Sequence, residues 1–171
     1  MCYTNSVKRD KTKQQREVMT MKMQIWFDMD GTIADLYAVE GWLPMLRNSD
    51  PTPYAEAQPM CRMCSLARQL NSLQSKGYTI GIISWLSKES NAEYDELVRK
   101  AKREWLAKHL PSVNWDIIEI VPYGTPKHEV CGAGILFDDE ERNRTNWTNS
   151  RAGVAFEPEH ISSILSMLGK C

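Results

Sequence analysis

Two aspartates stand two residues apart at the end of an apolar run, in the stretch IWFDMDGTIADLY (residues 25–37). Neighbouring carboxylates repel each other, and burying either of them without a partner is costly. Asp28 and Asp30 therefore either lie on a solvated loop or hold something positive between them. An aspartate can also accept a phosphoryl group covalently, and a second acid beside it can pass protons to and from the reacting oxygens.

Further polar side chains follow the apolar runs that come later in the chain. They are one hydroxyl, one ammonium and two more carboxylates: Ser84, Lys127, Asp138 and Asp139. If these runs are parallel strands, their carboxyl ends face one crevice, which is where ligands bind in such sheets. We therefore expect all of these groups to lie together.

The carboxylates of this set suit a hard cation. Asp28, Asp138 and Asp139 would supply oxygen ligands to Mg²⁺, with water molecules completing an octahedron. The ion would neutralise acids that otherwise repel one another. The sequence therefore predicts Mg²⁺ as a cofactor.

The remaining groups suit a phosphate beside that ion. The Ser84 hydroxyl and the Lys127 ammonium would donate to its oxygens, and loop amides at Gly31 and Thr32 would add further donors. Together with the acids, these residues predict phosphoryl-transfer chemistry.

Five short apolar runs predict the strands that position these residues. Each is rich in Ile, Val or aromatic side chains, and they span residues 24–28, 78–83, 116–121, 134–137 and 152–156. Several are apolar almost without interruption, which is typical of parallel strands covered on both faces. With helical periods between them, they predict an α/β fold with a doubly wound, mainly parallel five-stranded sheet.

Three apolar stripes of helical period accompany the strands, at residues 60–73, 94–105 and 161–168. Ser90 and Glu93 fit a capping box at the start of the second helix, which places its beginning at Ser90.

Residues 36–59 do not follow this alternation, because they hold four prolines and show only weak periodicity. They lie between the first strand and its return helix, so an insertion here would stand over the carboxyl edge of the sheet. We interpret the segment as a small helical cap within a catalytic domain of residues 23–171. A plain surface loop is the alternative.

The order of these motifs resembles that of the haloacid dehalogenase superfamily of phosphotransferases. Asp28-Met-Asp30-Gly-Thr after a hydrophobic strand matches the DxDGT signature of that superfamily, and the residues of its later motifs follow in order: Ser84, Lys127, Asp138 and Asp139. The resemblance implies that Asp28 is the nucleophile. It implies that Asp30 is the general acid/base, whose main-chain carbonyl also binds Mg²⁺. The serine and the lysine would hold the phosphoryl group, and the acid pair would add metal ligation.

Within that superfamily, the chain is similar to the compact 5′(3′)-deoxyribonucleotidase group. This similarity rests on three features: the sequence DMDGT, the small insertion after the first motif and the paired aspartates of the fourth motif. It implies an aromatic pocket for the nucleotide, to which Tyr37, Trp42 and Trp85 would contribute by stacking on the base. Hydrophobic packing is the alternative role for each of the two tryptophans. The insertion is shorter than in typical nucleotidases, which leaves the substrate open.

Three functions follow as hypotheses. The first is a Mg²⁺-dependent phosphomonoester hydrolase that forms an aspartyl-phosphate and acts on nucleoside monophosphates. The second keeps this chemistry but acts on a large substrate, such as a phosphorylated nucleic-acid end or a phosphoprotein. The third is a non-catalytic module that binds a nucleotide or a partner. The retention of both aspartates and of Lys127 favours catalysis.

Charge is distributed unevenly along the 171 residues. Residues 1–22 carry six Lys or Arg and two acids, whereas the rest of the chain carries fifteen and twenty. We predict a basic, disordered extension at residues 1–22, and contact with nucleic acid is the alternative.

The cysteines indicate a reduced environment. There are five of them, an odd number, and no apolar signal region precedes them, so we expect a cytoplasmic protein. Cys61 and Cys64 have the spacing of a zinc site but lie in a helical stripe, which predicts packing in the core. No stretch is apolar for long enough to predict a membrane span.

Overall fold

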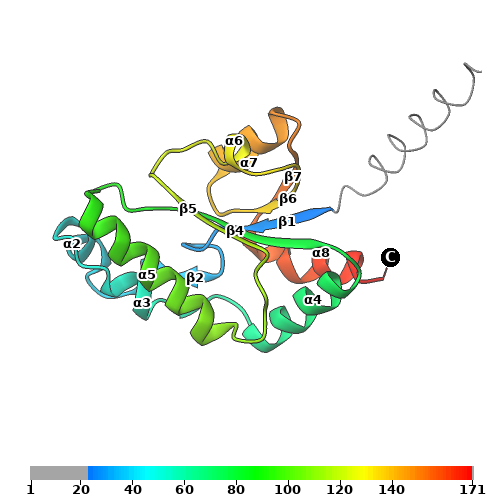
Figure 1. The fold of residues 1–171 in the computed structure, drawn as a ribbon, viewed down its shortest axis with the longest axis horizontal. Coiled ribbons are helices and arrows are strands. Elements are labelled where there is room, and N and C mark those ends of the chain that lie inside the picture. The colour runs from blue at the N-terminus through cyan, green and yellow to red at the C-terminus, as the bar shows by residue number, and fades with distance from the viewer. Residues whose placement is uncertain (1–22, 171) are drawn as a thin grey trace, which may run out of the picture.

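The computed structural model describes residues 23–170, and a five-stranded sheet forms its centre (Figure 1). The strands are β1 (Gln24–Phe27), β4 (Thr79–Trp85), β5 (Ile117–Val121), β6 (Gly134–Phe137) and β7 (Gly153–Phe156). They lie in the order β5-β4-β1-β6-β7, and every neighbouring pair is parallel. Each strand falls on one of the five predicted runs, so the predicted α/β fold with a parallel five-stranded sheet is confirmed.

Helices cover both faces of this sheet (Figure 1). They are α4 (Met63–Ser75), α5 (Ala92–His109), α6 (Lys127–Val130), α7 (Glu141–Asn149) and α8 (Ile161–Leu168). Ile25 and Phe27 of β1 pack in one core with α4, α5 and α8, whereas Trp26 packs with Trp147 of α7 in another. Because successive strand residues point to opposite faces, the central strand anchors both layers.

The segment between β1 and α4 folds into short elements. They are β2 (Ala34–Asp35), η1 (Leu36–Ala38), α2 (Trp42–Arg47), α3 (Thr52–Glu56) and β3 (Gln58–Pro59), with β2 and β3 paired antiparallel. Leu36, Leu46 and Tyr54 form an apolar cluster with Tyr94 and Val98 of α5. The segment therefore lies against α5, beside the carboxyl edge of the sheet (Figure 1).

The first of the predicted helices begins later than its stripe indicated. α4 starts at Met63, and Met60 lies before it with 45% of its surface exposed. The face that packs on the sheet is centred on Leu66 and Leu70, which turns Cys64 outward. Cys61 and Cys64 are both exposed, so the prediction that they pack in the core is wrong.

The second helix is capped by a different residue from the one predicted. The Asn91 side chain accepts a hydrogen bond from the Tyr94 amide at 2.9 Å, which makes Asn91 the N-cap of α5. Ser90 instead donates to the Asp95 carboxylate at 2.6 Å. Asparagine is as good a cap as serine, and it lies one residue nearer to the helix.

The third helix matches its stripe, because α8 spans the same residues, 161–168. It directly follows the short helix η2 (Pro158–His160). Within residues 23–170, no helix combines the length and the apolarity that a bilayer crossing requires. The predicted disordered basic extension of residues 1–22 lies outside the residues that the structure describes.

Candidate active site

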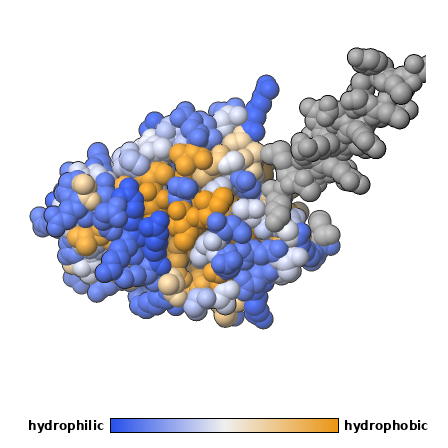
Figure 2. All heavy atoms as spheres, viewed as in Figure 1, coloured by the Kyte–Doolittle hydropathy of each residue, from blue (hydrophilic) through white to orange (hydrophobic). Residues whose placement is uncertain are grey.

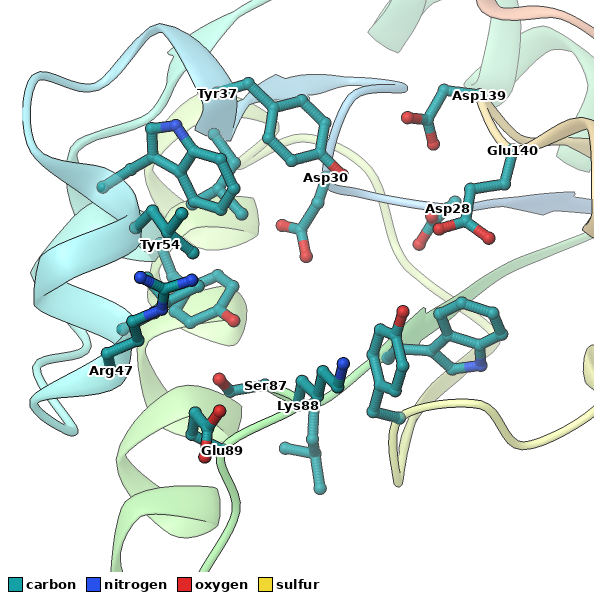
Figure 3. A pocket seen from close by; sticks show the side chains of 17 residues that line it. Asp28, Asp30, Tyr37, Arg47, Tyr54, Ser87, Lys88, Glu89, Asp139 and Glu140 are labelled. Carbon is teal, nitrogen blue, oxygen red and sulfur yellow. The ribbon is translucent and has the colours of Figure 1, made fainter.

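Seven polar side chains gather at the carboxyl edge of the sheet, and three of the seven, Asp28, Asp30 and Asp139, line a cavity (Figure 3). Six of the seven were predicted from the sequence: Asp28, Asp30, Ser84, Lys127, Asp138 and Asp139. The seventh is Lys102 of α5, which belongs to none of the motifs found in the sequence.

A tight turn after β1 presents the two aspartates. The Asp28 amide donates to the Phe137 carbonyl at 2.9 Å, which extends the sheet as far as the first acid. The chain then turns through Gly31, whose φ of 72° lies in the left-handed region that favours glycine. A Cβ at Gly31 would collide with the Asp139 carboxylate and come within 2.8 Å of the Tyr37 ring. Glycine is therefore required here both for the turn and for the approach of the fourth motif.

Gly31 and Thr32 have another role than the one expected of them. Their amides donate within the turn, to the carbonyls of Ala34 (2.9 Å) and Met29 (3.1 Å), so neither is a free donor for a phosphate. The Thr32 hydroxyl is buried and accepts from the Asp139 amide at 3.1 Å. These two residues hold the first and fourth motifs together.

Lys127 lies between the first and fourth motifs. Its Nζ is 3.0 Å from Asp28 Oδ2 and 2.6 Å from Asp138 Oδ2, and its side chain is 2% exposed. Burial by itself would lower the pKa of Lys127, but the Asp28 and Asp138 carboxylates outweigh it and raise the pKa. The side chain is therefore an ammonium at neutral pH. The indole of Trp85 lies beside it, with its centre 5.1 Å from Nζ.

The two aspartates of the fourth motif differ in their surroundings. Asp138 is fully buried, and its oxygens accept hydrogen bonds from Lys127, from the Asn143 side chain and from the Glu140 amide. Asp139 is partly exposed, lines the cavity and faces the turn at Gly31. Asp139 is thus the member of the pair that faces the open site.

Three carboxylates form a cluster with the chemistry of a metal site. One oxygen from each of Asp28, Asp138 and Asp139 lies within 4.8 Å of the others. Burial and the charge of Asp28 raise the pKa of Asp138 to about 6 and that of Asp139 to about 7. One ammonium does not balance three carboxylates, and a hard oxygen set of this kind fits Mg²⁺.

Asp30 points into the cavity (Figure 3), and its Oδ2 accepts a hydrogen bond from Lys102 Nζ at 2.6 Å. Burial raises the pKa of Asp30; the Lys102 ammonium opposes that rise and Asp28 adds to it. A raised pKa is the direction that suits a carboxyl group to act as a general acid.

Ser84 lies within β4 rather than at its end, because the strand continues to Trp85. Its side chain is fully buried, and its Oγ accepts a hydrogen bond from Lys102 Nζ at 2.8 Å. Lys102 is found from sequence only by its position: it stands four residues after Val98 and three before Trp105, on the buried stripe of α5.

A cavity of about 360 Å³ opens in front of these groups (Figure 3). Its aromatic lining includes Tyr37, Trp42 and Trp85, which were predicted, and Tyr54 and Tyr123, which were not. Tyr37 meets Trp42 edge-on, with ring centres 5.2 Å apart, and Trp85 lies 5.0 Å from Tyr123. One pair comes from the inserted segment and the other from the ends of β4 and β5, so the cavity has aromatic groups on both sides.

The strand order β5-β4-β1-β6-β7, with helices on both faces, defines a mainly parallel, doubly wound α/β fold. A solved structure with this fold is that of the D,D-heptose 1.7-bisphosphate phosphatase from B. bronchiseptica, in complex with magnesium and phosphate. The TM-score is 0.55 over 86% of this chain and 98% of that one, with 12% sequence identity. No protein-family model and no curated protein sequence matches the chain.

Proposed function

We propose that the protein is a Mg²⁺-dependent phosphomonoester hydrolase that acts through an aspartyl-phosphate on Asp28. The observation that carries the proposal is the contact of Lys127 with Asp28 and Asp138, inside a cluster of three carboxylates at the floor of a cavity. Transfer of a phosphoryl group requires a nucleophile and positive charge beside the phosphoryl oxygens. Asp28 is the nucleophile of this proposal, Lys127 supplies one positive charge, and the three carboxylates suit a metal ion that would supply more. The magnesium and phosphate in the similar phosphatase support the same chemistry.

Asp28 and Asp139 would hold the ion, together with the main-chain carbonyl of Asp30. Asp138 is less suited to direct ligation because its oxygens already accept hydrogen bonds from Lys127, Asn143 and a main-chain amide. When bound, Mg²⁺ would neutralise the acids and stabilise negative charge on the phosphoryl oxygens.

In the proposed reaction, a side chain of the site serves each step. An Asp28 oxygen attacks phosphorus, and the bond from phosphorus to the leaving oxygen breaks as Asp30 gives that oxygen a proton. Lys127 has three N–H groups and two acceptors in this site, so one N–H remains for a phosphoryl oxygen. Asp30, now ionised, takes a proton from water as the water attacks phosphorus, which releases phosphate and restores Asp28.

Nucleoside monophosphates are the substrates that we propose. A cavity of about 360 Å³ is of the size that binds small molecules. Its aromatic groups are suited to stacking on a base, which every base permits because each has a π-face. The inserted helices α2 and α3 stand beside the site, and their lining residues Trp42, Leu46 and Tyr54 favour a small substrate over a large one.

Phosphate release from a panel of phosphate esters tests both parts of the proposal. The panel contains 5′- and 3′-nucleotides, ribose 5-phosphate, other sugar phosphates, 3′-phosphorylated oligonucleotides and p-nitrophenyl phosphate, each with Mg²⁺ and with EDTA. We expect Mg²⁺-dependent release that Asp28→Asn abolishes and that Asp95→Asn, a matched change at the start of α5, leaves intact. Preference for sugar phosphates or oligonucleotides would refute the substrate and keep the chemistry. Release that persists in Asp28→Asn would refute the mechanism.

A further inference from the structure

Lys102 is a charged side chain buried in the middle of α5. None of its surface is exposed, and its neighbours on the buried stripe are Val98, Ala101 and Trp105. Packing at this position calls for an apolar residue, because removing an ammonium from water is costly. The charge must therefore serve contacts that an apolar side chain cannot make.

Those contacts converge on the site. Lys102 Nζ lies 2.6 Å from Asp30 Oδ2, 2.8 Å from Ser84 Oγ and 2.6 Å from the Trp85 carbonyl oxygen. The ring of Tyr54, from the inserted helix α3, lies over the same nitrogen with its centre 4.8 Å away. One side chain thus joins α5, β4, the turn after β1 and the inserted segment.

The number of these contacts separates Lys102 from Lys127. An ammonium has three N–H donors and no acceptor, and Lys102 has an acceptor for each of the three. It has no donor left for a phosphoryl oxygen, whereas Lys127 keeps one. Any effect of Lys102 on the reaction must therefore pass through the groups that it binds.

The direction of each hydrogen bond fixes the role of its partner. Ser84 Oγ accepts from Lys102, and Ser84 is itself fully buried and is not among the residues that line the cavity, so this contact holds Lys102 in place. Asp30 Oδ2 is occupied by Lys102, which leaves Oδ1 to carry the proton that the leaving oxygen needs.

We propose that Lys102 is a positioning residue for protonation of the leaving group: it holds Asp30 by one oxygen and leaves the other oxygen directed at the substrate. This inference rests on the proposed phosphatase activity. It distinguishes Lys102 from a packing residue because its removal affects most the esters whose leaving group needs a proton.

Two esters with the same phosphoryl group test the role. p-Nitrophenolate leaves without a proton, whereas the alkoxide of a nucleoside 5′-monophosphate needs one. We compare kcat/KM for both, since this constant reports the steps up to the phosphoaspartate. For Lys102→Met, which keeps the length of the side chain, we expect a loss of about 100-fold or more on the nucleotide, the range of general acid catalysis. On p-nitrophenyl phosphate we expect a loss at least tenfold smaller.

Lys100→Met is the matched control. Lys100 stands on the exposed side of the same helix, with its side chain 70% exposed and 3.9 Å from Glu104, and we expect wild-type constants on both esters. Circular dichroism and thermal melting establish that each variant is folded. If Lys102→Met does not fold, Lys102→Arg decides by the same ratio, because a planar guanidinium retains the charge but does not reproduce the three convergent contacts.

The outcomes are separable. If Lys102→Met lowers kcat/KM by the same factor on both esters, or on neither, the positioning role is overturned while the phosphatase activity stands. A wild-type protein that hydrolyses p-nitrophenyl phosphate but no nucleotide refutes the substrate, and the test then uses the alkyl phosphate that is hydrolysed fastest. A wild-type protein that is inactive on every ester of the panel refutes the proposed function, and the role of Lys102 falls with it.

Discussion

Replacing Gly31 with alanine separates two requirements that this position meets at once. The left-handed φ of 72° strains any residue with a Cβ, at a cost of roughly 1–2 kcal/mol. The added methyl also collides with the Asp139 carboxylate and the Tyr37 ring. The first effect lowers stability alone, whereas the second displaces a carboxylate that we propose as a metal ligand.

Gly77→Ala is the control that isolates the second effect. Gly77 has a φ of 92° in the turn after α4, and an added Cβ there meets nothing within 4 Å. We expect both variants to lose about 2–8 °C in Tm, because roughly 1–2 kcal/mol corresponds to that shift in a chain of this size. Only Gly31→Ala is expected to lose activity.

Titration of activity with Mg²⁺ measures the difference. Displaced support of a metal ligand typically costs about 10–100-fold in affinity, so we expect the half-saturating Mg²⁺ concentration of Gly31→Ala to rise at least about tenfold. Gly77→Ala should keep the wild-type value. If Gly31→Ala binds Mg²⁺ and turns over like wild type, the proposed arrangement of Asp139 and the turn is wrong.

Three further predictions follow from the same contacts. Lys127→Met should reduce kcat by about 10²–10³-fold, because it removes the cation that contacts Asp28 and Asp138, and steady-state kinetics at saturating Mg²⁺ measure this loss. Because the pKa values of Asp138 (about 6) and Asp139 (about 7) lie above the usual 3.8, the folded chain binds more protons than the unfolded chain between about pH 4 and 7. The Tm of the metal-free protein should therefore fall as the pH rises through this range, and Mg²⁺ should restore it at pH 8; a Tm that rises with pH would contradict the buried acid cluster. Trp42→Ala should raise KM for nucleotides by about 5–100-fold, the range of a lost base stack, and leave KM for ribose 5-phosphate unchanged; equal effects on the two substrates would argue against a stacked base.

Much of the site was predictable because its residues stand beside the strands that position them. Asp28 and Asp138 each follow directly on a buried apolar run, and Ser84 lies within one. Strand period and apolarity are local properties, and parallel strands bring their carboxyl ends to one edge. The sequence by itself therefore determined the sheet and the residues along that edge.

The remaining parts depend on distances that no local pattern contains. Lys102 is 72 residues from Asp30 in the chain, and Tyr54 reaches the same ammonium from the inserted segment. The exposure of Cys64 depends on which face α4 turns to the sheet, and the stripe did not fix that rotation. Hydrogen bonds inside the turn, rather than its composition, removed the amides of Gly31 and Thr32 as free donors.

Burial explains why the structure alone decided these points. From sequence alone, a lysine on a helix is expected to be exposed to solvent, because burial of its ammonium requires compensating partners. Those partners lie on other elements of the fold. The sequence determined which acids belong to the site, because each of them lies at or just after the end of a predicted strand. Which of them faces the cavity, and what holds each in place, was fixed by the packing of α5, the inserted segment and the sheet.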